Sequence, residues 1–498
     1  MNVNPITRLD YPDPDVIRVE DTYYMVSTTM HFMPGCEILQ SFDLVHWEHV
    51  TYVYETLDHT DAQQLKSGQN IYGQGMWAAS LRYHEGRFCI CFVANDTRKT
   101  YLYTSEKIDG PWKKQLIEGF YHDGSLLFDE DGRNYIVYGN DEIWITELNE
   151  DLTAPKKDGL HRLLVSDHKN PELGYEGSHI QKINGYYYIF LIHSLRDRWM
   201  RTEACFYSDS LEGEFTGGDV LCDDRGYCGQ GVAQGGIVDT PDGKWYAMLF
   251  QDSGAVGRIP ILLPVTWKDH FPFFGQNGHV PEEIEVHSTR PGYIYQPLVG
   301  SDDFCNGLLP HWQFNHDPDP RYYHLDALQG TYTITTREVC TELTQAVNTL
   351  TQRMSYPSCA AEVTVDASAM KEGDVAGLCA LQSCYAAVGI TKHHGKYEVL
   401  MLDKKEDGIL DMTEGTVVES HQMDFRLEAD FCNMKDEARC YYRVNKGDWL
   451  PIGTVHKLYF KLDHFTGCRF GLFCYAAEET GGSACFRDFK YYDVDEIS

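Results

Sequence analysis

Apolar residues in the first half of the chain come in pairs of short runs, each pair joined by a tight polar turn. The first pair is residues 16–19 and 23–27. The other four pairs are residues 76–83 with 88–93, 122–128 with 135–138, 175–180 with 187–191, and 234–238 with 245–250. Their turns carry Glu-Gly, Asp-Gly or Asn-Gly, which between apolar runs are typical of β-hairpins. The pattern therefore predicts five hairpins.

The five hairpins recur at intervals of 46 to 64 residues, which indicates a repeat architecture. A single hairpin leaves its faces uncovered, and five such units arranged around an axis predict a five-bladed β-propeller. The residues that lead into the innermost strands would then converge at one end of the axis. These lead residues are Asp13, Trp77, Asp123, Glu176 and Gln234.

The pattern changes from about residue 301, where short alternating strands are separated by polar turns. Examples are residues 330–335, 360–365, 397–402 and 458–462. This spacing predicts a β-sandwich, and the Pro/Gly-rich stretch 271–281 before it predicts a linker or closing loop. Helical periodicity is weak throughout, so the predicted fold class is all-β. We predict a propeller domain over residues 1–295 and a sandwich domain over residues 300–498.

Composition narrows the classes of partner. The 498 residues exceed the size of a single core, and 42 basic against 75 acidic residues give a net charge of −33. This charge argues against nucleic acid or an anionic membrane as a partner. No apolar run approaches the roughly 20 residues of a membrane span, and the N-terminus shows no secretory pattern. The 16 cysteines are scattered without zinc spacing, as expected of reduced thiols in a cytoplasmic protein.

Three of the five lead residues are carboxylates, Asp13, Asp123 and Glu176. Their equivalent positions in the repeat favour a shared site over scattered surface charge. Two carboxyl groups about 6.5–9.5 Å apart can hydrolyse a glycosidic bond with inversion, one as base toward water and one as acid toward the leaving oxygen. A third carboxylate nearby would raise the pKa of the acid. The ring of Trp77 is expected to stack against a sugar ring. The alternative is that Trp77 packs in the core at the propeller axis.

Short motifs run through the whole chain in a specific order. They are Asn4-Pro5, Pro12-Asp13-Pro14-Asp15, Ser27-Thr28, Phe32-Met33-Pro34-Gly35, Ser41-Phe42-Asp43-Leu44, Trp47, Trp77-Ala78, Leu81-Arg82, Gly110-Pro111-Trp112, Asp123, Phe128-Asp129, Asp131-Gly132, Glu176-Gly177-Ser178-His179 and Gly257-Arg258. In this order the chain resembles glycoside hydrolase family 43, in particular its two-domain β-xylosidases and α-L-arabinofuranosidases. The C-terminal part resembles the concanavalin-like β-sandwich of these enzymes.

The resemblance implies three catalytic roles. Asp13 would be the general base, Glu176 the general acid, and Asp123 the residue that tunes the pKa of the acid and orients it. The neighbouring Asp15 would point to the opposite side of the strand and take no part. The resemblance also implies substrate-binding residues, which are Phe32, Trp77, Arg258 and Gln234.

Many members of the family carry a histidine near an axial metal, usually calcium, where this chain has Gln234. The amide oxygen of Gln234 can bind a hard cation or accept a hydrogen bond from water. Two occupants are therefore expected as alternatives beside it, an axial structural calcium or a water molecule. No cofactor is expected for the chemistry itself.

These features predict an exo-acting hydrolase that releases terminal α-L-arabinofuranosyl residues from arabinoxylan-type oligosaccharides by inversion. Residues 257–260 and 271–275 look most like the arabinofuranosyl-specific branch. A β-D-xylosidase, or a bifunctional enzyme, is the alternative on the same machinery. A non-catalytic carbohydrate-binding propeller is the alternative from another class. The expected partner is a small oligosaccharide, and the oligomeric state stays open.

Overall fold

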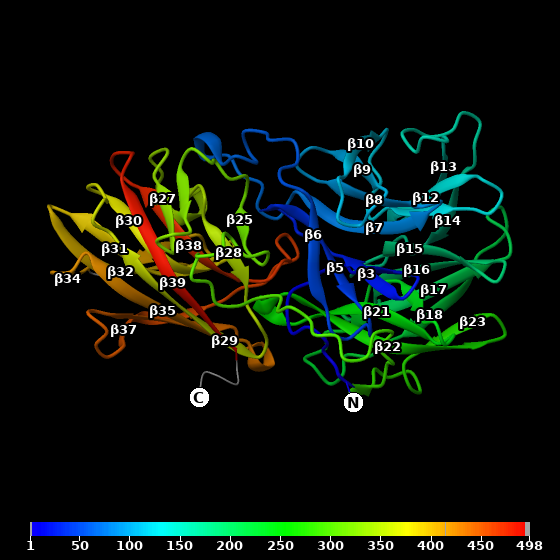
Figure 1. The fold of residues 1–498 in the computed structure, drawn as a ribbon. Coiled ribbons are helices and arrows are strands. Elements are labelled where there is room, and N and C mark those ends of the chain that lie inside the picture. Colours follow the sequence, from blue (N-terminus) through cyan, green and yellow to red (C-terminus); the bar gives the residue numbers. More distant parts are fainter. Residues whose placement is uncertain (1, 414, 494–498) are drawn as a thin grey trace.

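The five predicted hairpins are the inner strand pairs of five antiparallel sheets arranged around an axis (Figure 1). The computed structural model describes residues 2–413 and 415–493, and in these ranges it contains strands and four 3₁₀ turns but no α-helix. The turns are η1 (Lys66–Gly68), η2 (Gly254–Val256), η3 (Leu343–Gln345) and η4 (Cys432–Met434). The predicted all-β propeller and sandwich are confirmed. Residues 1, 414 and 494–498 of the two predicted domain ranges lie outside the described residues.

Each blade is a sheet of neighbouring chain segments whose first strand lies nearest the axis. Blade 1 is β2 (Asp15–Val19), β3 (Thr22–Val26), β5 (Gly35–Ser41) and β6 (Glu48–Tyr54). Blade 2 is β7 (Met76–His84), β8 (Arg87–Ala94), β9 (Lys99–Ser105) and β10 (Lys113–Ile117). Blade 3 is β11 (Ser125–Phe128), β12 (Asn134–Asn140), β13 (Glu142–Leu148) and β14 (His161–Ser166). Blade 4 is β15 (Glu176–Ile183), β16 (Tyr186–Ser194), β17 (Arg201–Ser208) and β18 (Thr216–Leu221).

Blade 5 differs because its innermost strand is split by the backbone turn at Gln234. It consists of β19 (Val232–Ala233), β20 (Ile237–Asp239), β21 (Trp245–Asp252), β22 (Arg258–Lys268) and β23 (Phe271–Phe274). The prediction of a linker or closing loop over residues 271–281 is therefore wrong for its first four residues, which pair with the end of β22. Proline is tolerated there because β23 is an edge strand.

The ring closes between the N-terminus and the segment after blade 5. Strand β1 (Asn2–Val3) pairs with β24 (Glu283–Ile284), and the Asn4 side chain bonds both the N–H and the carbonyl of Leu262 in β22. Arg18 of blade 1 also pairs with Asp239 of blade 5. Polar bonds across this seam hold the first and last blades together.

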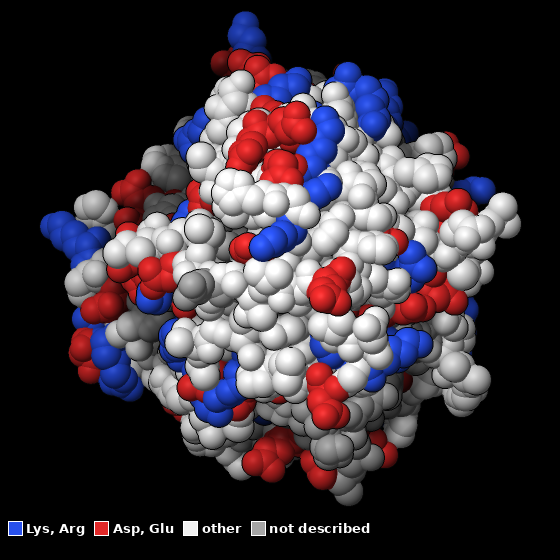
Figure 2. Space-filling model, turned by 90° about the vertical axis from the view of Figure 1, so that its left-hand side faces the viewer, with Lys and Arg blue, Asp and Glu red and all other residues white. Residues whose placement is uncertain are grey.

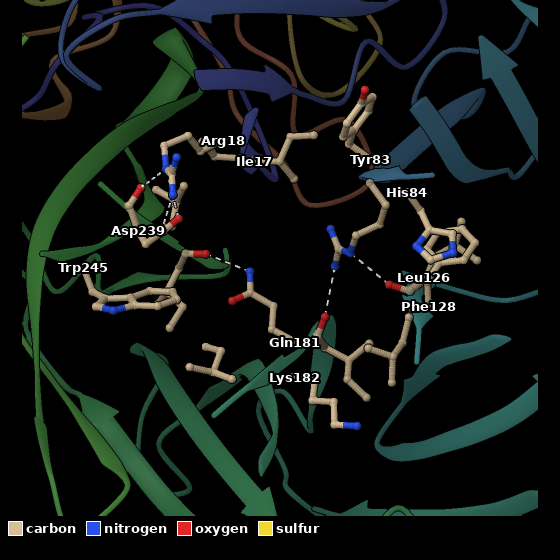
Figure 3. A pocket seen from close by; sticks show the side chains of 17 residues that line it. Ile17, Arg18, Tyr83, His84, Leu126, Phe128, Gln181, Lys182, Asp239 and Trp245 are labelled. Carbon is tan, nitrogen blue, oxygen red and sulfur yellow. Dashed lines mark hydrogen bonds and ion pairs between the residues drawn. The ribbon is translucent and has the colours of Figure 1, made fainter. Parts of the chain in front are cut away.

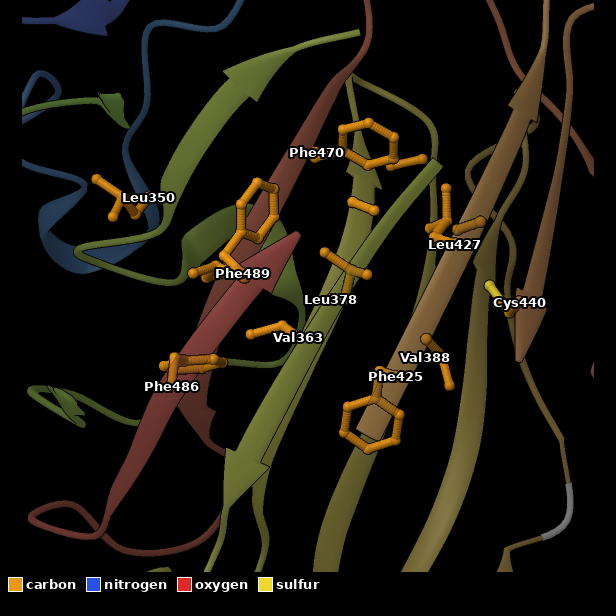
Figure 4. Close-up of a cluster of buried hydrophobic side chains, with 14 of the residues drawn as sticks. Leu350, Val363, Leu378, Val388, Phe425, Leu427, Cys440, Phe470, Phe486 and Phe489 are labelled. Carbon is orange, nitrogen blue, oxygen red and sulfur yellow. The ribbon is translucent and has the colours of Figure 1, made fainter. Parts of the chain in front are cut away.

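The C-terminal part is a sandwich of two antiparallel sheets, with Figure 4 showing the apolar side chains between them. One sheet contains β4 (Phe32–Met33), β25 (Gln313–Asn315), β28 (Leu350–Arg353), β38 (Arg469–Ala476), β30 (Asp374–Leu381), β31 (Tyr385–His393), β32 (Lys396–Lys404), β33 (Leu410–Met412) and β34 (Thr416–Val418). The other contains β26 (Tyr323–Asp326), β27 (Thr331–Thr335), β39 (Ser483–Asp493), β29 (Ser358–Asp366), β35 (Gln422–Asp430), β36 (Glu437–Arg443) and β37 (Leu450–Lys457).

The predicted strand over residues 458–462 is not formed. Strand β37 ends at Lys457, and the following residues form a loop toward the propeller. Leu458 is buried whereas Leu462 is exposed. The alternating apolar pattern arises because this loop packs against the sandwich on one side and faces a cavity on the other.

The two parts are joined by a buried polar junction. Strand β4 of the propeller pairs with β25 and so extends a sheet of the sandwich. Glu37 and Arg353 form an ion pair of 2.8 Å, each 2% exposed. Burial would raise the pKa of Glu37, but Arg353 and His49 lower it to about 2. A buried pair of this kind is costly to break, because either partner alone would be an uncompensated charge.

The surface charges, the thiols and the lack of a membrane-spanning helix among the described residues agree with the composition of the chain. On the sandwich end of the molecule, acidic and basic side chains are interspersed with uncharged surface (Figure 2). All 16 cysteines are free thiols, most of them buried. Among the described residues, no helix is long and apolar enough to cross a membrane.

Candidate active site

The five innermost strands begin with the same unusual backbone turn. Positive φ angles occur at Asp13 (53°), Ala78 (22°), Asp123 (48°), Gly177 (63°) and Gln234 (57°), one in each blade. Non-glycine residues rarely adopt this left-handed region, and such strain is found where surrounding structure holds it for function. The repeat predicted from the sequence therefore extends to the backbone conformation beside each lead residue.

All five lead residues line one cavity of about 210 Å³ at this end of the axis. Arg258 lines it as well, as predicted from the resemblance. The other lining residues are His122, Asn140, Leu173, Trp199, Arg201, Leu462 and Phe465. The prediction that the lead side chains converge is confirmed.

Asp13 is held by two short hydrogen bonds. Arg258 Nη1 donates to Oδ1 at 2.6 Å, and Thr28 Oγ1 donates to Oδ2 at 2.6 Å. Asp13 and Arg258 are only 3% and 6% exposed. Because both oxygens are bonded, the carboxylate has one fixed orientation in the cavity wall. Asp15, two residues on, instead bonds Arg82 and His179 deeper in the channel and does not line the cavity.

Asp252 links two arginines behind the cavity. Arg258 Nε and Arg201 Nε donate to its two carboxylate oxygens at 3.2 and 2.7 Å. Burial would raise the pKa of Asp252, but these arginines lower it. Burial would likewise lower the pKa of Arg258, yet Asp13, Asp252 and Glu176 raise it. The Arg258 guanidinium therefore stays charged beside the carboxylates.

Asp123 and Glu176 face each other with His122 between them. His122 Nε2 lies 3.5 Å from Asp123 Oδ2 and 3.6 Å from Glu176 Oε2, and Asn140 donates to Glu176 Oε2 at 2.9 Å. Burial and the charges of Glu176 and Asp13 raise the pKa of Asp123 to about 6. Burial would also raise the pKa of Glu176, but His122 lowers it. The carboxyl groups thus differ in proton affinity although they lie together.

The surroundings of Gln234 bear on the predicted axial calcium. A cavity of about 10 Å³ lies among the lead residues, with Gln234 and His179 in its wall. Such a space holds about one water molecule, whereas calcium takes about six to eight oxygen ligands. Gln234 offers one neutral amide oxygen, and both oxygens of Asp13 are already bonded. These residues fit a water better than calcium, and the calcium stays a prediction.

Phe32 does not line the cavity, which corrects its predicted place in the pocket wall. Its ring is 2% exposed and lies under the Arg469 guanidinium, whose central carbon is 3.5 Å from the ring centroid. The reason is that β4 pairs with the sandwich sheet, so the side chain is directed into the junction. Trp77, in contrast, does line the cavity as predicted.

A loop of the sandwich completes the site. Phe465 packs edge-on against Trp77, with ring centroids 5.1 Å apart, and Arg258 lies 3.9 Å above its ring centroid. The loop is anchored because the N–H of Gly467 donates to Asp10 and the N–H of Cys468 donates to the Ala255 carbonyl. The propeller cavity therefore takes one wall from the second domain.

Phe465→Ala is expected to lower kcat/KM by about ten- to a hundredfold, because the aromatic and cation–π contacts that it removes are each worth about 0.5–2 kcal/mol. Steady-state kinetics and thermal melting would measure the effect. Phe460→Ala is the matched control, since Phe460 lies on the same loop but does not line the cavity. Equal losses in both variants would show that the loop acts only through stability.

A larger cavity of about 410 Å³ lies at the opposite end of the axis (Figure 3). It is lined by the far ends of the five innermost strands, and its charged groups are held in ion pairs: Arg18 with Asp239, Arg82 with Asp15 and Lys182 with Asp129. Arg82 separates the two cavities by bonding Asp15, Ser125 and the carbonyls of blades 3 and 4. Among the described residues that line this cavity, Asp239 carries the single carboxyl group, so the smaller cavity is the candidate site.

The sequence reasoning missed seven lining residues, one of which, Leu173, lies in the loop before β15. His122 directly precedes a lead residue, and Asn140 ends the second strand of the same blade, so the repeat register was a usable signal for both. Trp199 and Arg201 lie before and at the start of β17. Leu462 and Phe465 carried no such signal, because they come from the other domain.

Both parts of the chain match models of known protein families. A family model described as "Glycosyl hydrolases family 43" matches residues 3–272, and one described as "Beta xylosidase C-terminal Concanavalin A-like domain" matches residues 301–492. A β-xylosidase of Formosa agariphila is 26% identical and is aligned over 99% of this chain and 89% of its own length. A non-reducing end α-L-arabinofuranosidase of Bacteroides ovatus is 24% identical over 82% and 79% of the two chains.

Solved structures agree with this match. A "Bifunctional GH43-CE" protein of Bacteroides eggerthii is 42% identical with a TM-score of 0.92, and it covers all of this chain, which spans 64% of that protein. An engineered GH43 enzyme with endo-xylanase and exo-arabinofuranosidase activity is 27% identical with a TM-score of 0.86, and the alignment covers 99% of both chains. Both likenesses extend over the propeller and the sandwich.

Proposed function

The chain belongs to glycoside hydrolase family 43, and we propose that it is an exo-acting hydrolase that releases terminal α-L-arabinofuranosyl residues from arabinoxylan-type oligosaccharides by inversion. The observation that carries the proposal is the presence of Asp13 and Glu176 in the wall of one small cavity. Asp13 is bonded on both oxygens, whereas Glu176 lies beside His122 and Asp123. The two carboxyl groups therefore have the different surroundings that a base and an acid need.

The size of the cavity supports attack at a chain end. At about 210 Å³ it is smaller than the roughly 300–1,000 Å³ of sites for drug-sized ligands, so it suits one sugar unit. Arg82 fills the channel below it. A sugar entering from the open side would meet Trp77, Trp199 and Phe465 as apolar walls. An internal unit of a long polysaccharide has no exit through such a closed pocket.

In the proposed reaction, Asp13 takes a proton from water as that water attacks the anomeric carbon. Glu176 gives a proton to the departing oxygen, which leaves with the bonding electron pair. Arg258 neutralises Asp13 and lies where it can donate to sugar hydroxyls. The negative charge of Asp123 disfavours ionisation of Glu176 and so supports its role as acid. This mechanism needs no metal.

A β-D-xylosidase is the second candidate. The names of several relatives favour it, among them the Formosa agariphila β-xylosidase. The chemistry would be the same, because the carboxyl groups and Arg258 act on the ring and its substituents in the same places. The choice of sugar then depends on the walls of the cavity rather than on the reacting groups.

The test is to incubate the protein with 4-nitrophenyl α-L-arabinofuranoside and, separately, with the β-D-xylopyranoside, following the sugar by proton NMR. The arabinofuranoside is expected to give the higher kcat/KM. Its first-formed product is expected to be the β anomer, because one attack by water inverts the configuration.

Three outcomes would count against the proposal. A higher kcat/KM on the xyloside would favour the second candidate. The α anomer appearing first would indicate a covalent intermediate and overturn inversion. Binding of oligosaccharides without hydrolysis, measured by calorimetry, would favour a carbohydrate-binding propeller instead.

A further inference from the structure

His122 lies at the centre of the site without a conventional bond. Its Nε2 is buried and has no hydrogen-bond partner in the described part of the chain, yet it lies 3.5 and 3.6 Å from one oxygen each of Asp123 and Glu176. These are ion-pair distances, slightly longer than a hydrogen bond. A neutral imidazole at this place would leave a buried donor or acceptor unsatisfied, whereas an imidazolium has two carboxylates to compensate it.

The charges around the ring favour the protonated form. Asp123 faces it from its own segment, Glu176 from the start of β15, and Asp13 from the segment before β2. On the other side of Glu176, Arg201 of β17 and Arg258 of β22 hold that carboxyl in its anionic form. Burial would lower the pKa of His122, but the three carboxyl groups raise it to about 9. His122 thus keeps a proton next to Glu176 at a pH at which a carboxyl group alone would have lost it.

We propose that His122 is a positioning residue that stores the proton delivered by Glu176 to the leaving oxygen, and that it reloads Glu176 after each turnover. This inference rests on the proposed function of Glu176 as the acid. It resolves the difficulty that His122 and the arginines favour a negative Glu176 in the free site. A charged His122 beside a negative Glu176 holds the same number of protons as a neutral His122 beside a neutral Glu176. In both forms the pair therefore contains the proton that the leaving oxygen needs.

Protons move in a closed cycle during one turnover. When substrate displaces water from the cavity, a proton moves from His122 Nε2 to Glu176 Oε2, because the imidazolium and the carboxylate both lose their solvation by water and the neutral pair does not carry that cost. Glu176 passes it to the departing oxygen as the glycosidic C–O bond breaks, and that oxygen keeps the bonding electrons. Asp13 releases to solvent the proton taken from the attacking water. His122, neutral at this stage, takes one proton from solvent, so one water is consumed and no proton is gained or lost overall.

The test compares pH profiles of kcat/KM on an arabino-oligosaccharide for the wild type, His122→Phe and His122→Gln, over about pH 4–10. The wild-type alkaline limb is expected near pH 9, where His122 loses its proton. In both variants it is expected to move down by about two pH units or more, into the range of a buried carboxyl group. Since activity above the limb falls about tenfold per pH unit, the loss should be about a hundredfold at pH 9 and much smaller at pH 5.

Asn140→Ala is the matched control, because Asn140 bonds the same Glu176 oxygen but carries no titratable proton. It is expected to lower the rate while leaving the alkaline limb near its wild-type pH. A parallel loss at every pH in the His122 variants, with an unmoved limb, would overturn the proposal and indicate a merely structural role.

A second measurement needs no substrate, so it distinguishes failure of this inference from failure of the proposed function. In protein labelled with ¹⁵N-histidine, the ring signals that disappear in His122→Gln are expected to show an imidazolium at about pH 8. A ring that loses its proton below about pH 7 would overturn the proposal whatever sugar the enzyme accepts. If neither variant folds, the ring signal that shifts in Asn140→Ala, which changes the same Glu176 oxygen, assigns His122 without substrate.

Discussion

Asp13→Asn is expected to lower kcat/KM by about 10²–10⁴-fold on every substrate, because an amide cannot take the proton from the attacking water. The fold should survive. Asn tolerates the left-handed backbone found at position 13, and its amide oxygen can still accept from Arg258 or Thr28. Steady-state kinetics with circular dichroism and thermal melting would separate lost chemistry from lost structure.

Thr28→Ala is the matched control for Asp13. It removes the hydrogen bond to Oδ2 but keeps the carboxylate and its bond to Arg258. A loss of about fivefold is expected, which corresponds to one lost hydrogen bond of about 1 kcal/mol. If Asp13→Asn kept more than about a tenth of the activity, Asp13 could not be the base.

Glu176→Gln is expected to show a loss that depends on the leaving group. On arabino-oligosaccharides the leaving alcohol is poor and must be protonated, so kcat/KM should fall by about 10²–10⁴-fold. On a 2,4-dinitrophenyl glycoside the leaving group departs as a stable anion, and most of the activity should remain. The ratio of the two losses measures the contribution of the acid.

The two variants control each other. Asp13→Asn should lose activity on both substrates, because water must be activated whatever group leaves. Equal losses on both substrates in Glu176→Gln would mean that this carboxyl group does something other than protonate the leaving oxygen. Buried charge next to Asp123 and His122 makes thermal melting of the Glu176 variant a necessary companion measurement.

Local sequence carried most of the fold. Hairpins depend on turn dipeptides and on alternation over a few residues, and both are visible in the chain without knowledge of its partners. The repeat register then predicted which residues lead into the axis, and all five lead side chains do line one cavity. The register of the repeat was enough to predict this convergence, because equivalent positions in the blades of a propeller lie at the same height around its axis.

Where the sequence reasoning failed, a contact with a distant segment decided the structure. Residues 271–274 became the edge strand of blade 5 because the end of β22 was free to pair. Phe32 lies outside the pocket because β4 pairs with β25 of the sandwich. The strand predicted over residues 458–462 became a loop because its exposed side faces the propeller cavity. In each case the local pattern suited more than one structure.

The sequence by itself therefore determined the five hairpins, the all-β class and the convergence of Asp13, Asp123 and Glu176. Only the tertiary structure placed His122 between two carboxyl groups and brought Phe465 against Trp77 and Arg258. The physical reason is that strand pairing follows short-range pattern, whereas proton affinity and cavity walls depend on burial and on charges from segments far apart in the chain.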